Sequence, residues 1–483
     1  MLALAALPAT DSWNALVVGF ALLGELLAVV FVYRVLVRGG SPASTLLWMA
    51  VIVATPWLGL LLYYLLPRRL HLRRLRRLRH RGERLREVRG MPAARRRRAA
   101  GPGGGLAALL AGDDGSGLVG GNEVTWLPSG EQFVTSAIAA IDAAVRHVHC
   151  VVYILRSDAA GRRFLAALTR AAARGVKVRL LYDSFGSFGL ENADLQPLRA
   201  AGGAAVAFLP LLWQRRPFTV NRRNHRKLLV VDGEVGFVGG RNVGDEYFTD
   251  RWGNQHTWFD AMVLVRGPVV DRMQDVFIED WCTATDEVLA DTFVVPKPVG
   301  DVRVGIVCSG PDREQSDLWF AVVQAIGEAT TTIDMSSPYL VLPSTLRFVL
   351  QLAAARGVRV RIFTNGSHSE ALILYHAQRS LYRELLASGI EIHESVTDYE
   401  HTKVIVVDGR TVIVGSANMD LRSAHLNFEI AAVAVEARTL AAEVAATIEA
   451  RKARFRLVDK ADLPRRPWSR ALDAVCGLLS PLL

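Results

Sequence analysis

The chain has few cysteines and no pattern that would use them as a disulfide framework. Only four occur in 483 residues, Cys150, Cys282, Cys308 and Cys476, and none has the Cys-x-x-Cys spacing of a metal site or redox pair. They lie mostly in apolar runs. We therefore expect buried thiols in a protein of a reducing compartment.

A basic surface is also missing outside one segment. The formal net charge is +10, which on its own would be compatible with nucleic-acid binding. However, fifteen arginines and only two acidic residues fall between Arg68 and Arg98, and the rest of the chain has 42 basic and 45 acidic residues. Because the remainder is not basic, the composition argues against a nuclease that holds nucleic acid along its body.

Two long apolar runs are present near the N-terminus, from about Ala15 to Tyr33 and from about Thr45 to Leu66. Each is close to the length that crosses a bilayer, so we predict two transmembrane helices. A cleaved signal peptide is the alternative for the first run, but the first ten residues contain no basic side chain. Glu25 lies within the first run, and we expect it to be protonated or to face the partner helix.

The arginines that follow Leu66 predict the orientation of the chain. By the positive-inside rule they keep the downstream body on the cytoplasmic side. The same segment either lies on the anionic leaflet or is a solvated topogenic run, and the sequence leaves both readings open. We divide the chain into a membrane anchor (1–67), an Arg-rich segment with a Gly-rich linker (68–121), and two halves of a body (122–300 and 301–483).

One stretch of the body occurs twice, with an offset of 176 residues. The shared residues are His225, Lys227, Asp232 and Asn242 in the first copy and His401, Lys403, Asp408 and Asn418 in the second. Apolar runs on both sides of Asp-Gly predict a buried β-hairpin with a tight turn in each copy. His and Lys two residues apart share one face of a strand, and two buried cations there need an anion. Each Asp lies at the turn, where a turn-forming and a direct chemical role are both open.

The segments around the two motifs also repeat. Strand 148–155, helix 159–174 and strand 176–182 are predicted in the first half, and strand 332–335, helix 344–356 and strand 358–363 in the second. We therefore predict a duplicated α/β sandwich with an active site on a pseudo-twofold axis between the halves.

His-x-Lys-x-x-x-x-Asp followed by Gly-Gly/Ser-x-Asn, present twice, resembles the signature of the phospholipase D superfamily. The resemblance implies one active centre formed by both motifs. The Lys and Asn donors hold a phosphodiester, one His attacks phosphorus, and the other His protonates the leaving alkoxide. The sequence does not rank the two His roles, and only the analogy to the superfamily favours His225 as the nucleophile. No metal and no other cofactor is expected.

A carboxylate behind each imidazole would set its tautomer. The candidates are Asp260 and Glu429, each of which opens the apolar strand that follows a motif, where the superfamily keeps its His-supporting acid. An ordinary acid at the end of a strand is the alternative for both.

Further segments resemble bacterial cardiolipin synthases, a branch of this superfamily. They are Gly239 to Phe248, Ser309 to Pro311, Ser337 to Leu340 and Ser480 to Leu483. The resemblance implies a multi-pass protein of the bacterial cytoplasmic membrane that binds phosphatidylglycerol and other anionic phospholipids, not nucleic acid. It would transfer a phosphatidyl group between two phosphatidylglycerol molecules and release glycerol.

Several alternatives stay open. Residues 364–369 depart from the best-known branch, which leaves the second lipid substrate undefined. One other interpretation is another phospholipase D-type phosphatidyltransferase or phospholipase, with phosphatidylethanolamine or serine as co-substrate. A membrane-anchored nuclease and a non-catalytic membrane scaffold are the remaining ones. The apolar end, Trp468 to Leu483, either rests on the membrane or packs in the core. The sequence does not define an oligomeric state.

Overall fold

The computed structural model describes residues 9–37, 42–65, 105–110, 117–209, 222–248, 257–287, 289, 296–313, 316–367, 369, 371–463 and 466–478. The chain divides into two compact units, Met1–Arg74 and Leu75–Leu483. The predicted Arg-rich segment lies outside the described residues. The predicted linker does so only in part, because Gly105 opens a helix and Gly120 and Gly121 belong to a strand.

The first unit contains helices α1 (Ala9–Val37), α2 (Pro42–Ala54) and α3 (Pro56–Leu65). Among the described residues one helical segment, Val17–Val37, is long and apolar enough to cross a membrane, with a mean hydropathy of 2.2. The prediction of two such helices is therefore not confirmed.

The second predicted span is divided between α2 and α3. Pro56 has no N–H to donate, and the Thr55 hydroxyl donates to the Val51 carbonyl (2.9 Å), a combination that bends helices. Glu25 is exposed on α1, so it does not face a partner helix.

In its described part, the second unit is built on one mixed sheet of fifteen strands, in the order β19-β13-β12-β10-β15-β16-β18-β9-β1-β8-β6-β5-β2-β3-β4. Strands of the first half are β1 (Val119–Leu127), β2 (His147–Val152), β3 (Lys177–Asp183), β4 (Ala204–Phe208), β5 (Leu228–Val231), β6 (Val235–Gly239) and β8 (Met262–Arg266). Those of the second half are β9 (Val302–Ser309), β10 (Thr332–Ser336), β12 (Arg359–Asn365), β13 (Glu391–Ser395), β15 (Val404–Val407), β16 (Thr411–Gly415), β18 (Glu429–Val435) and β19 (Phe455–Leu457).

The strand order reads nearly the same outward from its centre, where β1 pairs antiparallel with β9. On one side come β8, β6, β5, β2, β3 and β4, and on the other β18, β16, β15, β10, β12 and β13. The repeat in the sequence is thus a repeat in topology. The two halves share one continuous sheet, which the sequence did not indicate.

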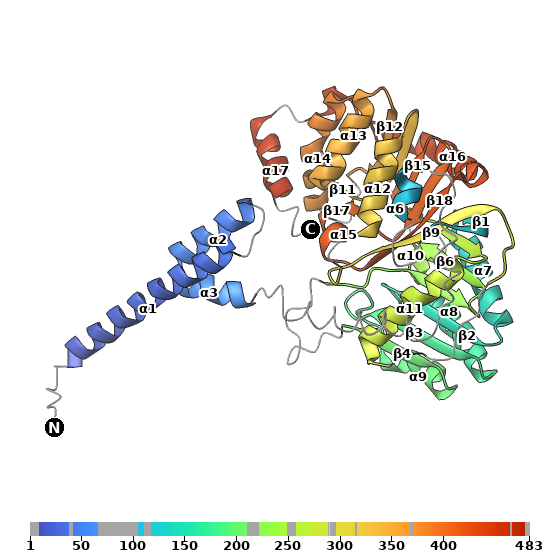
Figure 1. The fold of residues 1–483 in the computed structure, drawn as a ribbon, viewed down its shortest axis with the longest axis horizontal. Helices are drawn as coiled ribbons and strands as arrows, with labels where there is room; N and C mark the ends of the chain where they lie inside the picture. The colour runs from blue at the N-terminus through green and yellow to red at the C-terminus, as the bar shows by residue number, and fades with distance from the viewer. Residues whose placement is uncertain are drawn as a thin grey trace. The chain divides into compact units, whose positions relative to one another are not determined.

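Helices cover both faces of this sheet (Figure 1). They are α7 (Gly130–Ala143), α8 (Ala159–Ala173), α9 (Asn192–Ala200), α10 (Asp245–Phe248) and α11 (Val270–Thr285) in the first half, and α12 (Asp317–Glu328), α13 (Ser344–Ala355), α14 (Leu372–Ala387), α15 (Leu421–His425), α16 (Arg438–Arg451) and α17 (Pro467–Leu478) in the second. The short α6 (Gly105–Leu110) packs on α12. The 3-10 helices are Lys452–Arg454 and Lys460–Asp462.

Three apolar cores hold the layers together. One lies under α7 and α8 and a second under α12 and α13. The third joins α11 and α16 to strands of both halves, so it is shared between them. All four cysteines are buried thiols, as predicted.

The two predicted hairpins are confirmed as β5–β6 and β15–β16. Both turn residues have positive φ in each hairpin, 55° and 69° at Asp232 and Gly233, and 52° and 60° at Asp408 and Gly409. Asp and Gly tolerate this left-handed backbone better than other residues, which explains the Asp-Gly pair.

Candidate active site

Backbone pairing between the halves brings the two motifs together. The His225 N–H donates to the Phe428 carbonyl (3.0 Å), and the His401 N–H donates to the Phe259 carbonyl (2.7 Å). The second contact continues a short parallel pairing of β14 (Asp398–Glu400) with β7 (Thr257–Phe259). The segment before each motif histidine is therefore paired with the segment before a carboxylate of the other half.

The carboxylates consequently support the histidines crosswise. His225 Nδ1 lies 3.0 Å from both carboxylate oxygens of Glu429, and His401 Nδ1 lies 2.6 Å from Asp260 Oδ2. All four side chains are buried. Among the described residues, the polar partners of both rings lie at Nδ1. A carboxylate that accepts the Nδ1 proton leaves a lone pair on Nε2, which is the form a nucleophile needs.

The residues beside the carboxylates differ between the halves. The Ser416 hydroxyl donates to Glu429 (2.5 Å), whereas its counterpart in the first motif is Gly240. A Cβ at Gly240 would lie 2.1 Å from Asp260 Oδ1, so glycine is required there. The shorter aspartate and the glycine occupy the space that glutamate and serine occupy in the other half.

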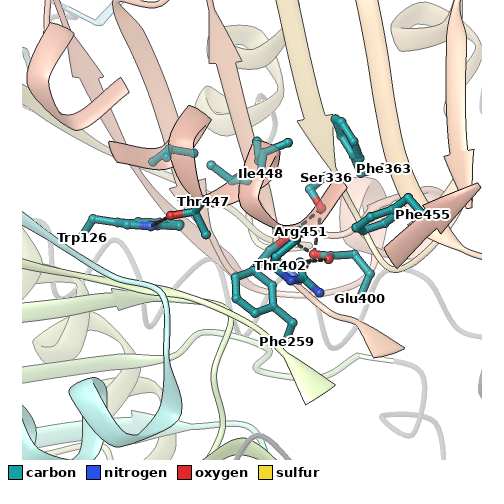
Figure 2. Close-up of a pocket in the computed structure, with 12 residues that line it drawn as sticks. Trp126, Phe259, Ser336, Phe363, Glu400, Thr402, Thr447, Ile448, Arg451 and Phe455 are labelled. Atoms are coloured by element: carbon teal, nitrogen blue, oxygen red, sulfur yellow. Dashed lines mark hydrogen bonds and ion pairs between the residues drawn. The ribbon is translucent and has the colours of Figure 1, made fainter. Parts of the chain in front are cut away.

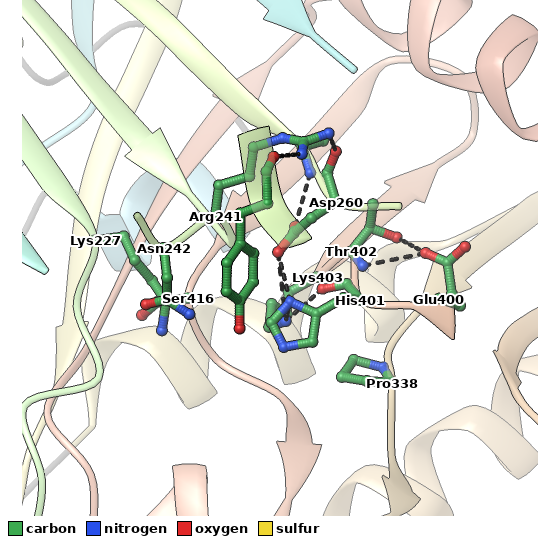
Figure 3. A network of polar contacts seen from close by, with 12 residues as sticks. Lys227, Arg241, Asn242, Asp260, Pro338, Glu400, His401, Thr402, Lys403 and Ser416 are labelled. Carbon is green, nitrogen blue, oxygen red and sulfur yellow. Dashed lines mark hydrogen bonds and ion pairs between the residues drawn. The ribbon is translucent and has the colours of Figure 1, made fainter. Parts of the chain in front are cut away.

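The motif lysines lie next to their histidines. Lys227 Nζ donates to the His225 carbonyl (2.7 Å), and Lys403 Nζ lies 2.9 Å from His401 Nδ1 and 3.9 Å from Asp260. Figure 3 shows Lys403, His401 and Asp260 together, with Lys227, Asn242 and Ser416 on the other side of the site.

The motif asparagines are also buried. Asn242 Oδ1 accepts the N–H of Ile154 (3.1 Å), which leaves its amide N–H groups for a ligand. In the part of the chain that the structure describes, Asn418 Oδ1 is buried without a hydrogen-bond partner. The two lysines and Asn242 therefore offer donors from both halves.

Each motif aspartate lies at its hairpin turn, where the sequence left a turn-forming and a direct chemical role open. The Asp232 carboxylate accepts the N–H groups of Val145 (2.9 Å), Arg146 (2.7 Å) and His147 (2.8 Å). Asp232 lies seven positions after His225, which corresponds to roughly 20 Å of mostly extended chain.

The Asp408 carboxylate likewise accepts the backbone N–H groups of residues 330–332, with N···O distances of 2.8 to 3.2 Å. Both aspartates thus fix the start of a neighbouring strand, and the turn-forming interpretation is the one that agrees with the geometry.

Two arginines that the sequence interpretation missed lie behind the carboxylates. The guanidinium carbon of Arg226 lies 5.6 Å from the centre of the Phe428 ring. The guanidinium carbon of Arg451 lies 3.3 Å from the centre of the Phe259 ring. Each phenylalanine directly precedes a carboxylate. An aromatic-acid pair repeated after each motif was the available signal, but nothing local indicated the arginine partners.

Arg451 also borders a small cavity, shown in Figure 2. There it pairs with Glu400 (2.5 Å), which also accepts the N–H of Thr402 (3.1 Å). Thr402 lines this cavity, whereas the neighbouring His401 does not. The cavity has room for about one water molecule and cannot be the substrate site.

The buried ionisable groups of the site favour the binding of an anion. Burial lowers the pKa of His225 to about 4, and burial with the Lys403 charge lowers the pKa of His401 to about 3. Burial also holds the pKa of Lys227 well below its ordinary value. Although burial alone would raise them, the pKa values of Asp260 and Glu429 are lowered by their cationic neighbours. A bound phosphodiester would add negative charge and raise the pKa of the imidazoles, so that one can act as an acid.

These shifts predict a pH dependence of stability. Each folded-state imidazole pKa lies below the unfolded value, so between about pH 4 and pH 6.5 the unfolded chain binds more protons and stability rises with pH. At pH 5 each histidine should cost on the order of 2 kcal/mol relative to pH 7. Chemical unfolding of the wild type and the His225→Gln/His401→Gln variant at both pH values should give a smaller loss in the variant. Equal losses would contradict the assigned shifts.

The chain matches the family described as "Cardiolipin synthase, PLD-like domain" over residues 137–281 and 322–452. It is 34% identical to a cardiolipin synthase of Geobacillus kaustophilus (strain HTA426), over 94% of this chain and 92% of the relative. It is also 34% identical to a cardiolipin synthase of Geobacillus thermodenitrificans (strain NG80-2), over 98% and 96%. A crystal structure of phosphatidylserine synthase from Haemophilus influenzae Rd KW20 matches with a TM-score of 0.57 and 14% identity, over 74% of this chain and 95% of that one. The last likeness concerns the fold alone.

Proposed function

The chain belongs to the cardiolipin synthase family, with its phospholipase D-like domain, and from that premise we propose how its site transfers a phosphatidyl group. The enzyme is a phosphatidyltransferase, and the substrate is a phospholipid such as phosphatidylglycerol. The observation that carries the proposal is the crossed pairing of two imidazoles with two carboxylates in one buried site.

In the first step the phosphodiester of phosphatidylglycerol lies between the two imidazoles. Lys227, Lys403, Asn242 and Asn418 donate to its non-bridging oxygens and stabilise the charge of the pentacovalent state. Nε2 of one histidine attacks phosphorus, the bond to the glycerol oxygen breaks, and the other histidine gives that oxygen its proton. Glycerol leaves and a phosphatidyl group remains on the first imidazole.

In the second step a hydroxyl of another phosphatidylglycerol takes the place of glycerol. The second imidazole, now neutral, accepts the proton of this hydroxyl while its oxygen attacks phosphorus. The bond from phosphorus to Nε2 breaks, cardiolipin forms, and both histidines return to their starting states. Glu429 and Asp260 act as positioning residues, because each holds the Nδ1 proton of the histidine from the other half.

Incubation of the purified full chain with glycerol-labelled phosphatidylglycerol tests this reaction. We expect one labelled glycerol to be released for each cardiolipin formed. Phosphatidic acid as the main product would indicate hydrolysis, and a product with another headgroup would indicate a different acceptor; either result would contradict the proposal.

The proposed chemistry does not involve a metal. Among the described residues no group of three His, Cys, Asp or Glu side chains could hold one. The lysines and asparagines carry the charge of the transition state instead, so treatment with a chelator should leave turnover within about twofold of the untreated enzyme. Strong loss restored by one divalent ion at low concentration would contradict this. Turnover on short-chain phosphatidylglycerol is the measurement, because divalent ions also alter anionic bilayers.

We further propose that α1 and the α2–α3 pair are two membrane crossings, with the body in the cytoplasm. Support comes from the apolar α1, from the near-continuous helical stretch 42–65 and from the fifteen arginines that follow it. Alkaline phosphatase inserted after Gly40 of the full chain should be active, and the same enzyme fused after Arg98, which retains the fifteen arginines, should be inactive. Activity of the second fusion would contradict the orientation.

A further inference from the structure

Helix α17 has two different faces. Asp473 on its inner face accepts from His376 of α14 (2.7 Å), and Cys476 packs with Val341 and Ala377. On the outer face Trp468, Leu472, Val475 and Leu478 are 63%, 42%, 54% and 81% exposed. These four residues, the α17 stripe, recur at helical spacing, so α17 shows an apolar face to its surroundings.

Helix α17 is linked to the second motif through one strand pair. Figure 1 shows α17 beside α14. Val341, on which Cys476 packs, belongs to β11 (Leu340–Val341), and β11 pairs with β17 (Met419–Asp420). β17 begins directly after Asn418 of the second motif. The helix is therefore anchored on the strand pair that holds a phosphate-binding candidate.

The first half also exposes apolar side chains beside the site. Phe185 and Phe188, the rim phenylalanines, are 47% and 81% exposed in the loop after β3. The loop is held in place, because Asp183 accepts the N–H groups of Phe185 (2.9 Å) and Gly186 (3.1 Å). Gly186 packs against Tyr153, whose ring lies 4.8 Å from the His225 ring.

Charge distinguishes a membrane from an apolar protein partner. The one acidic residue of α17, Asp473, is buried in its pair with His376, while Arg466 and Arg470 are exposed. An apolar helix face with exposed cations and no exposed anion is the pattern of a helix that lies in the interface of an anionic bilayer.

We propose that the α17 stripe and the rim phenylalanines are the surface on which the body rests on an anionic phospholipid bilayer. This placement sets the site against the bilayer, so that a lipid headgroup can reach the imidazoles while its acyl chains stay in the membrane. The inference rests on the proposed function and adds how its substrate is reached.

The first test locates the surface in vesicles of equal parts phosphatidylcholine and phosphatidylglycerol that contain the full chain. Because the four native cysteines are buried, a cysteine introduced by Val475→Cys can carry an environment-sensitive fluorophore. Brominated lipids should quench this label. They should not quench the same label at Val145→Cys, an exposed position near the Asp232 turn, at the other end of the hairpin from His225. Equal quenching at the two positions, or none at Val475→Cys, would overturn the proposal.

The second test separates docking from chemistry. Leu472→Glu/Val475→Glu, and separately Phe188→Glu, should lower turnover of vesicle phosphatidylglycerol by about tenfold or more. Turnover of dihexanoyl-phosphatidylglycerol below its micelle concentration should stay within about twofold, and Val145→Glu should change neither rate. Unchanged vesicle turnover, or an equal loss on both substrates, would overturn the proposal. A wild type inactive on both substrates would instead refute the proposed function and leave the quenching result to decide the surface.

Discussion

Replacing either His225 or His401 with alanine is expected to reduce cardiolipin formation by about a thousandfold or more. One imidazole forms the bond to phosphorus and the other carries the proton in both steps, so neither can be lost. The expectation depends on the geometry, since both rings are buried in one site and each is held by the other half. Turnover of short-chain phosphatidylglycerol is the measurement, because membrane contact does not enter it.

A matched control is His376→Ala, which removes an imidazole that pairs with Asp473 on α17. This variant should keep most of the short-chain activity. If His225→Ala or His401→Ala kept more than a few per cent while remaining folded, a single site shared by both motifs would be excluded.

Glu429→Gln and Asp260→Asn are each expected to lower turnover by about a hundredfold to ten-thousandfold. The neutral amide no longer fixes the Nδ1 proton, and it removes the negative charge that raises the pKa of the neighbouring imidazole. The loss should be mainly in kcat, because neither carboxylate contacts the lipid in the proposed reaction.

Because each carboxylate supports the histidine of the other half, the two variants should affect different histidines. The rate of modification by diethyl pyrocarbonate, mapped by peptide mass, should change at His225 in Glu429→Gln and at His401 in Asp260→Asn. A change at His225 in Asp260→Asn, without one at His401, would mean that each carboxylate supports the histidine of its own half. The crossed pairing would then be wrong.

Local features of this fold could be predicted from the sequence. The hairpins follow from apolar runs around Asp-Gly, and the positive φ at Asp232 and Asp408 explains why those pairs recur. The predicted helix 159–174 corresponds to α8 (Ala159–Ala173), because its apolar spacing is decided within a few turns.

Contacts between distant residues could not be predicted in the same way. Glu429 lies 204 residues from His225, and their contact depends on the bridge between Asn224 and Phe428. The spacing of a motif carries no information on which half supplies its carboxylate. The joining of the two halves into one sheet could not be predicted for the same reason, because it depends on the pairing of β1 with the distant strand β9.

Two further differences between the sequence-based predictions and the structure have local causes. Pro56 interrupts the second apolar run, so the count of apolar residues alone overstated the helix length. The apolar residues 468–483 predict contact either with the membrane or with the core, but the two contacts do not exclude each other. In the described part, α17 packs through Asp473 and Cys476 and exposes its other face.

The most direct measurement is to trap the covalent intermediate. The full chain is mixed with acyl-labelled phosphatidylglycerol, quenched rapidly under alkaline conditions that preserve phosphohistidine, digested, and mapped by mass. The account predicts one labelled peptide, with the phosphatidyl group on His225 or on His401, and no label in a variant that lacks the modified histidine. Rapid cardiolipin formation with label on neither histidine, or on another residue, would contradict it.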